Sequence, residues 1–380
     1  MIYFDNAATT MQKPPEVARA VAQAINQFGG VGRGAHDAAL SADMAVYIAR
    51  KRIAQLLGAP SAKHVAFMLN VTEALNAVIS GLLRAGDHAV TTAASHNSVL
   101  RPLYRKQDEE GVGLSILPVA PDGSISYEEF DALFTPQTKL AVVTHASNLT
   151  GDVYDIARMA RIAHEHGALI CVDAAQTAGV YPLCMAECGV DILAFTGHKG
   201  LMGPQGTGGL CLAEGIDLPH YNVGGSGTHS YDRQHPLFLP ERLEAGTLNA
   251  HGIAGLSEGV AFIQNVGVSA VCAHEKALAQ RFAQSARAIS GVRLYGGGAA
   301  DSVGIVALNV ADVDSSVVSD VLSRDFGICT RPGAHCAPLM HEALGTSEQG
   351  AVRFSFGYFN TEAEVDEGIQ ALSQIAASIA

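Results

Sequence analysis

The middle of this chain alternates short apolar runs with helical patterns, and this alternation constrains the fold more than any other feature. Runs of strand length lie at residues 88–92, 114–118, 139–144, 168–173, 191–196 and 207–212, and a helical pattern at 156–166 lies between two of them. Apolar strands that alternate with helices indicate a mostly parallel sheet covered by helices on both faces. The sequence therefore predicts an α/β fold.

After about residue 255 the pattern changes. One long helical stretch is predicted over 255–289, strands at 304–309, 328–330 and 351–356, and helices at 315–324 and 362–379. This mixture predicts a smaller α+β domain, and a chain of 380 residues has the length for two lobes. We expect an N-terminal segment (1–15) that packs with the small domain, a large domain (16–255) and a small domain (256–380).

Charge and composition exclude several classes of function. The chain has 24 Lys and Arg against 37 Asp and Glu, a net charge of −13, which is a poor match for nucleic acid or an anionic membrane. The N-terminus lacks a signal-peptide pattern, and no apolar run reaches the roughly 18 residues that span a bilayer. The seven cysteines form no CxxC pair and are odd in number, which favours a reducing compartment. We therefore expect a soluble cytoplasmic protein.

Polar residues follow three of the predicted strands, at the edge of the sheet where ligands collect. Asn148 follows the run at 139–144, Asp173 ends the run at 168–173, and Thr196, His198 and Lys199 end or follow the run at 191–196. Each of these residues alone could be a turn residue or a helix cap, but together they favour a ligand-binding site. A lysine and a carboxylate are what pyridoxal 5'-phosphate (PLP) requires, the first for its aldehyde and the second for its ring nitrogen.

Two further residues of the large domain have alternative interpretations. Thr72 stands where a helix is predicted to begin, either as a simple N-cap or as part of a phosphate seat at the positive end of the helix. His96 follows the run at 88–92 and is either an ordinary hydrogen-bonded histidine or a residue that stacks on a flat cofactor and moves protons.

A cysteine in a Gly/Pro-containing loop suggests what the cofactor is used for. Cys336 lies in the segment 331–337, where Arg331 and His335 could stabilise a thiolate and the loop could expose it; an inert buried cysteine is the alternative. Zinc ligation by these residues with Cys329 and His341 is disfavoured, because Cys329 is expected to be buried in a strand and no second cluster has metal spacing.

Arg353 stands inside an apolar, strand-like pattern, where an unpaired guanidinium would be costly. Two partners fit, the α-carboxylate of an amino-acid substrate and an acidic residue of the protein, and the sequence leaves both open.

These motifs together resemble the cysteine desulfurases, which are fold-type-I PLP enzymes of the class V aminotransferase group. The resemblance covers nearly the whole chain, and its most specific segments are 173–176 (DAAQ), 196–199 (TGHK) and 331–337 (RPGAHCA). The last segment resembles the branch with a short cysteine loop, which includes selenocysteine lyase-like members. The resemblance thus implies the PLP-dependent transferase fold of type I.

The resemblance also implies roles for individual residues. Lys199 would bond to the cofactor aldehyde and shuttle the substrate's α-proton, with Asp173 at the ring nitrogen, Gln176 at the ring hydroxyl and His96 on the ring face. The expected phosphate ligands are Val71, Thr72, Thr196, His198 and, from the partner subunit of a homodimer, Thr247. The expected substrate contacts are Asn148, Arg331, Arg353 and, near the partner's active-site entrance, Arg33.

The function that the resemblance implies is conversion of L-cysteine to L-alanine, with a persulfide left on Cys336 for a sulfur-acceptor protein. The sequence does not identify the acceptor: it is compatible with sulfur delivery to iron–sulfur cluster assembly, RNA thiolation or cofactor biosynthesis, and with selenium supply. Ala334 stands where many members of this branch have a second histidine, and the loop lacks a residue between Ala337 and Pro338. The alternatives are a selenocysteine lyase or C–S lyase, then a class V aminotransferase, and lastly a non-enzymatic scaffold.

Overall fold

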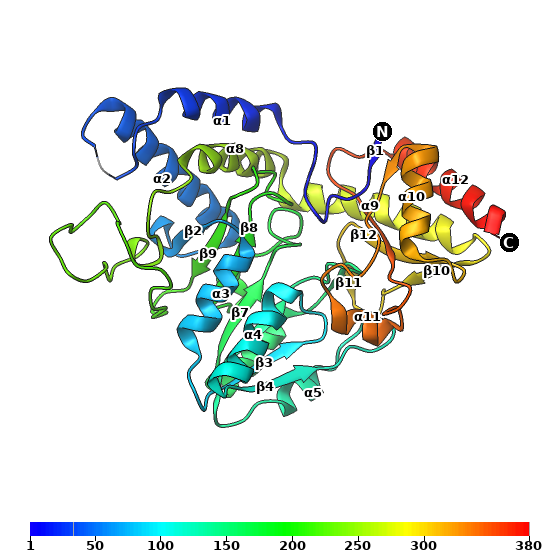
Figure 1. Ribbon diagram of the computed structural model, residues 1–380, viewed down its shortest axis with the longest axis horizontal. Coiled ribbons are helices and arrows are strands. Elements are labelled where there is room, and N and C mark those ends of the chain that lie inside the picture. The colour runs from blue at the N-terminus through cyan, green and yellow to red at the C-terminus, as the bar shows by residue number, and fades with distance from the viewer. Residues whose placement is uncertain (33, 380) are drawn as a thin grey trace.

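The computed structural model describes residues 1–32 and 34–379 and is built around a seven-stranded sheet of order β2-β9-β8-β7-β5-β3-β4 (Figure 1). The strands from β8 to β4 are parallel, whereas β9 is antiparallel to both of its neighbours. Their bounds are β2 Val65–Met68, β3 His88–Thr92, β4 Gly113–Leu117, β5 Thr138–Thr144, β7 Leu169–Asp173, β8 Ile192–Thr196 and β9 Gly208–Leu212. The predicted α/β fold with a mostly parallel sheet is confirmed.

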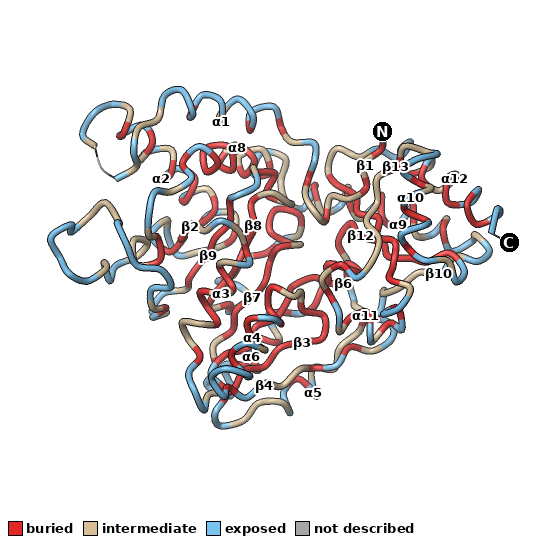
Figure 2. The backbone as a smooth tube through the Cα atoms, viewed as in Figure 1, coloured by how far each residue is buried: buried red, intermediate tan, exposed pale blue. Residues whose placement is uncertain are grey.

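Helices cover both faces of this sheet because its strands are apolar on both sides. Val142 and Cys171 belong to one core with α3 and α4, while their neighbours Val143 and Val172 belong to a second core with α2, α6 and α8. Figure 2 shows the strands as the most continuously buried part of the chain. The helices of this region are α1 Pro15–Gln27, α2 Asp37–Leu57, α3 Val71–Leu82, α4 Asn97–Glu110, α5 Tyr127–Ala132, α6 Ile156–Glu165, α7 Met185–Cys188 and α8 Ala250–Val266.

The C-terminal part forms a second, antiparallel sheet of order β10-β12-β14 with its own core. Its elements are α9 Val268–Arg287, β10 Val292–Tyr295, β12 Ile305–Val310, α10 Ser315–Phe326, α11 Pro338–Leu344, β14 Val352–Ser355 and α12 Glu362–Ile379. The smaller α+β unit is therefore present. The single helix predicted over 255–289 is wrong: α8 and α9 meet at an angle of 84° at Gly267, whose φ of 89° ends the first helix.

The N-terminal segment lies beside the small domain, where both chain ends are seen in Figure 1. β1 Ile2–Tyr3 pairs in parallel with β13 Ile328–Cys329, and Phe4 packs against Phe354 and Phe356. β6 Asp152–Val153 pairs with β11 Asp301–Ser302 and links the two parts of the chain. The division into 1–15, 16–255 and 256–380 remains a prediction.

Two smaller observations complete the fold. Cys329 is only partly buried in β13, whereas the sequence predicted a core position. Within residues 1–32 and 34–379, no single helix is both long and apolar enough to cross a membrane; taken together across their bend, α8 and α9 meet those two criteria.

Candidate active site

A cavity of about 280 Å³ opens where β5, β7 and β8 end and α3 and α4 begin. It brings together most of the residues predicted from the sequence: Val71, Thr72, His96, Asn148, Asp173, Gln176, Thr196, His198 and Lys199. The cavity is also lined by residues that were not predicted from the sequence: Ala8, Asn70, Ser98, Thr144 and Ala175. Parallel strands place their carboxyl ends at one edge of the sheet, so residues far apart in the chain line this cavity. These lining residues form the cavity wall.

Asp173 and Lys199 are the charged pair of this wall. Burial raises the pKa of Asp173, against the opposing effects of the Ala175 N–H, which donates to its Oδ1 at 2.9 Å, and of Lys199. Burial lowers the pKa of Lys199 to about 8, although the Asp173 carboxylate opposes this shift. The neutral amine, which is the form that can attack an aldehyde, is therefore more populated near neutral pH than in an ordinary lysine.

His96 is held in one tautomer at the N-cap of α4. Its Nδ1 accepts a hydrogen bond from the Ser98 N–H at 3.0 Å, so the ring proton of the neutral imidazole is on Nε2. Burial, reinforced by Lys199 and Arg331, lowers the pKa of His96 to about 4, so the ring is neutral. Ser98 is placed by the same helix start, and its spacing of two residues from His96 was a signal that the sequence analysis overlooked.

The start of α3 has the features of an anion seat. Asn70 caps the helix by accepting from the Glu73 N–H at 3.0 Å, and Thr72 Oγ1 lies 2.8 Å from Ser98 Oγ. Across the cavity, Thr196 Oγ1 is buried and has no hydrogen-bond partner within the described residues. A buried hydroxyl without a partner is costly and is satisfied if a ligand oxygen lies beside it. These features fit a phosphate group, the role predicted for Thr72 and Thr196, which stays a prediction.

The predicted substrate residues adjoin the cavity, but Arg353 already has a protein partner. Its guanidinium donates to Asp5 Oδ1 at 2.8 Å and to the Asn148 carbonyl at 2.8 Å, so the acidic residue left open by the sequence is present. Its Nε is buried and unpartnered within the described residues, as is Asn148 Oδ1. These two atoms leave hydrogen-bonding capacity for a substrate carboxylate and amine, whose recognition by Arg353 stays a prediction.

Cys336 lies in the short loop between β13 and α11 and is partly exposed. Its carbonyl accepts from the Asn97 N–H at 2.8 Å, which places it beside the N-terminus of α4 and His96. Asn148 Nδ2 donates to the carbonyl of the preceding residue, His335, at 2.7 Å. Arg331 pairs with Arg353 through their backbones, so the loop, β14 and the cavity wall are connected.

Two predicted residues are not brought to this cavity within one chain. Thr247 is exposed and lines a separate cavity next to Glu73 and Thr207, and its contact with a partner's phosphate stays a prediction. Arg33 lies outside the described residues. Among the residues that the structure does describe, no group of three or more His, Cys, Asp or Glu side chains is arranged to hold a metal ion.

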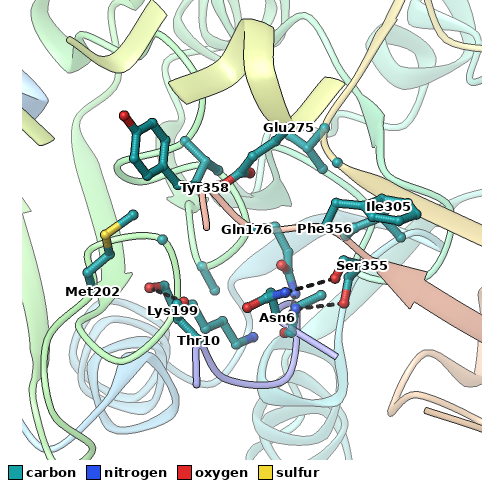
Figure 3. Close-up of a pocket in the computed structure, with 17 residues that line it drawn as sticks. Asn6, Thr10, Gln176, Lys199, Met202, Glu275, Ile305, Ser355, Phe356 and Tyr358 are labelled. Carbon is teal, nitrogen blue, oxygen red and sulfur yellow. Dashed lines mark hydrogen bonds between the residues drawn. The ribbon is translucent and has the colours of Figure 1, made fainter. Parts of the chain in front are cut away.

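A second cavity, of about 40 Å³, is lined by Gln176, Lys199 and residues of the N-terminal segment and small domain (Figure 3). It shares Ala175, Gln176 and Lys199 with the first cavity. On this side Thr10 Oγ1 donates to the Lys199 carbonyl at 2.7 Å, which fixes the backbone that carries the lysine. Glu275 of α9 also lines it, and burial raises the pKa of this carboxyl to about 8. The bond from Thr10 therefore ties the backbone of Lys199 to the N-terminal segment.

Comparison with known proteins agrees with the fold. The family model described as "Aminotransferase class-V" matches residues 2–367. The "Probable cysteine desulfurase" of Methanothermobacter thermautotrophicus is 32% identical, with 99% of this chain and 94% of the relative aligned. A relative of the same description from Mycolicibacterium paratuberculosis is also 32% identical over 99% of this chain, which spans only 55% of that longer protein.

Solved structures give the same result. An apo cysteine desulfurase from Thermococcus onnurineus NA1 superposes with a TM-score of 0.92 at 32% identity, covering 99% of this chain and 95% of the other. The cysteine desulfurase CsdA from Escherichia coli superposes with a TM-score of 0.89 at 28% identity, covering 99% and 94%. The architecture is that of the fold-type-I PLP enzymes. Within that class, the chain belongs to the aminotransferase class-V family.

Proposed function

We propose that this protein is a PLP-dependent cysteine desulfurase that converts L-cysteine to L-alanine and leaves a persulfide on Cys336. One observation carries the proposal: Lys199 and Asp173 line a single cavity whose wall holds unpartnered buried atoms of Thr196 and Asn148. The names of the relatives favour this activity over a selenocysteine lyase, a C–S lyase or an aminotransferase.

Different residues of the cavity would bind different parts of the cofactor. Lys199 would hold its aldehyde, Asp173 its ring nitrogen, Gln176 its ring hydroxyl and His96 its face, with Val71, Thr72, Thr196 and His198 around the phosphate. When bound, PLP supplies an aldehyde that condenses with amines and a ring that withdraws electrons from the substrate's α-carbon. The raised pKa of Asp173 fits a carboxyl that shares a proton with a ring nitrogen.

Proton transfer would involve two side chains, Lys199 and His96. The Lys199 amine, with a pKa lowered to about 8, would take the α-proton of the substrate and later return one. His96 presents its N–H at Nε2, because Nδ1 is engaged by Ser98. Asn148 and Arg353 would orient the substrate through its amine and carboxylate.

Sulfur transfer would then involve Cys336. Its Sγ attacks the sulfur of the substrate, a sulfur–sulfur bond forms, the bond from that sulfur to the substrate's β-carbon breaks, and the carbon skeleton leaves as alanine. Cysteine and a thiol are thereby converted to alanine and a persulfide with no external oxidant or reductant. The nucleophile must approach within about 3–3.5 Å of the substrate sulfur.

The test is Cys336→Ala. We expect this variant to keep the absorbance of bound PLP and to lose sulfide release from cysteine, while the wild-type peptide containing Cys336 gains the mass of one sulfur atom. Turnover rates with cysteine, selenocysteine and cystine as substrates distinguish a cysteine desulfurase from a selenocysteine lyase and from a C–S lyase. Full retention of cysteine desulfuration in Cys336→Ala would contradict the persulfide step.

We also propose a homodimer in the cytoplasm that delivers sulfur to an acceptor protein. Helix α2 exposes Leu40, Met44 and Tyr47 at 53%, 58% and 54%, an apolar face that a second copy would cover. Thr247 would then reach the partner's phosphate site. All seven cysteines are free, which is consistent with a reducing compartment. Molar mass by light scattering tests the dimer, and a monomer would contradict it.

A further inference from the structure

The nucleophile of the proposed reaction stands on a strained backbone. His335 and Cys336 have φ values of 52° and 55°, in the left-handed region that side chains other than glycine disfavour. Two such residues in succession persist only where the surrounding structure holds them. The carbonyls of both are held, by Asn148 Nδ2 at 2.7 Å and by the Asn97 N–H at 2.8 Å.

The side chain of His335 is held as well, by a chain of hydrogen bonds that fixes both ring tautomers. His335 Nε2 lies 3.0 Å from the Arg331 carbonyl, which can only accept, so Nε2 carries the proton. His335 Nδ1 is then an acceptor, and its partner at 3.4 Å, His341 Nε2, must donate. His341 Nδ1 in turn accepts from the Thr346 hydroxyl at 2.7 Å.

Burial supports this arrangement. His335, His341 and Thr346 are only 3%, 2% and 2% exposed, and the two rings lie nearly parallel, at 9°. Burial, with a contribution from Arg353, lowers the pKa of His335 to about 3, and burial also lowers the pKa of His341. Both rings are therefore neutral, as the donor and acceptor pattern requires. A polar atom left without a partner in so enclosed a site would be costly.

We propose that His341 is a positioning residue: through the His335 imidazole it holds the left-handed backbone of Cys336 and so aims the thiol for sulfur transfer. The chain runs from Thr346 through His341 and His335 to Arg331, whose backbone pairs with Arg353 in β14. This inference rests on the proposed desulfurase function, but the placement of the thiol can be measured without turnover.

The experiment compares His341→Phe with His341→Gln in the PLP-loaded full chain. Phenylalanine fills the space and removes the donor, whereas the glutamine amide can still donate to His335 Nδ1. We expect His341→Phe to lower kcat for cysteine about 10-fold, because a small misplacement of reacting atoms is costly, with little change in KM or PLP absorbance. The rate at which iodoacetamide alkylates Cys336 should change in the same variant, and His341→Gln should restore both rates in large part.

His88→Phe is the matched control, since His88 is also buried, bonds to Thr138 and Ser115, and lies at the amino end of β3, away from the cavity. It should leave kcat and the alkylation rate at wild-type values. If His341→Phe does not fold, Thr346→Val removes the donor to His341 Nδ1 and should shift both rates in the same direction.

Wild-type kcat and alkylation in His341→Phe would overturn the inference, as would equal losses in His341→Phe and His341→Gln. Failure of the wild-type protein to release sulfide from cysteine would instead refute the proposed function, and the alkylation rates would still test the positioning by His341.

Discussion

The cavity wall and the cysteine loop are built in different ways. The wall is made of strand ends and helix starts, and none of Thr72, His96, Asp173, Thr196 and Lys199 has a positive φ. The loop carries Cys336 on a left-handed backbone, next to His335 in the same conformation. The first region places its side chains by regular structure. The second depends on hydrogen bonds from two distant segments, through Asn97 and Asn148, and on His341 in the helix that directly follows the loop.

This difference predicts where each region is sensitive. A change in the wall should remove one chemical group and leave the rest in place, because the sheet holds the backbone. A change near the loop should move the thiol without removing any group, because hydrogen bonds to neighbouring side chains and backbone, rather than a strand or helix, hold its left-handed backbone. Substitutions in the two regions should therefore have different effects.

Replacing the lysine of the wall should have the largest effect. We expect Lys199→Ala to lower cysteine turnover at least about 10³-fold, because both the covalent attachment and the proton carrier are lost. Borohydride reduction of the PLP-loaded protein should label Lys199 in the wild type and leave the variant unlabelled. Lys106→Met, which alters another buried lysine far from the cavity, should retain turnover and labelling. Substantial cysteine turnover by Lys199→Ala would contradict a role of Lys199 in the reaction.

A small change beside the loop should also reduce turnover. A Cβ at Gly350 would lie 2.6 Å from Ser315 Oγ and 2.9 Å from the Gly333 Cα, so Gly350→Ala must displace the segment that leads to Cys336. We expect about a 10-fold or greater fall in kcat with the PLP absorbance retained. Gly345→Ala is the control, since its φ of 69° matches the 67° of Gly350 but no atom lies within 4 Å of its Cβ. Equal kcat in the two variants would contradict a loop placed by tight packing.

The stability of the PLP-free protein should depend on pH through Lys199. Its pKa is about 8 when folded and 10.5 ordinarily, so below pH 8 both states bind the proton and the folded state carries the full cost. Between these values only the unfolded state binds it, and the free energy of unfolding rises with pH. Relative to Lys199→Met, the wild type should gain about 1–3 kcal/mol over this interval. Urea unfolding at several pH values measures it, and parallel curves for the two proteins would refute the shift.

The smallest effect is expected at the phosphate seat. Thr196→Val keeps the shape of the side chain and removes its hydroxyl, so PLP affinity should fall about 5- to 10-fold. Thr196→Ser keeps the hydroxyl and should bind PLP nearly as well as the wild type. Titration of the PLP-free protein followed by absorbance gives both constants. Equal affinity of the Val and Ser variants would mean that the unpartnered Oγ1 does not contact the phosphate.

The cavity wall was more predictable from the sequence than the cysteine loop. The strand predicted at 88–92 agrees to the residue with β3, and the run ending at Asp173 agrees with β7 within one residue. Because apolar runs fix the strands, and strand ends fix the sheet edge, the meeting of Asn148, Asp173 and Lys199 could be predicted. The helix break at Gly267 could not, since the apolar pattern continues across it and only packing selects the bend.

Pairings between distant segments were equally inaccessible. The partner of Arg353 is Asp5, 348 residues away in sequence, and no local pattern connects them. The hydrogen bonds of His341 are local in sequence, to His335 and Thr346, but the sequence suggested at most a zinc ligand there. Roles that depend on bound PLP, on a second subunit or on Arg33 remain predictions.

The sequence by itself determined the α/β architecture, the edge of the sheet at which a ligand would gather, and the lysine and carboxylate that lie there. Local hydrophobic periodicity is sufficient for this, because strand length and direction decide where each strand ends. Only the tertiary structure decided how the backbone of Cys336 is held, through Asn97 and Asn148, and which acid neutralises Arg353. These features depend on hydrogen bonds between residues far apart in the chain, and such contacts exist only once the two parts of the molecule have packed together.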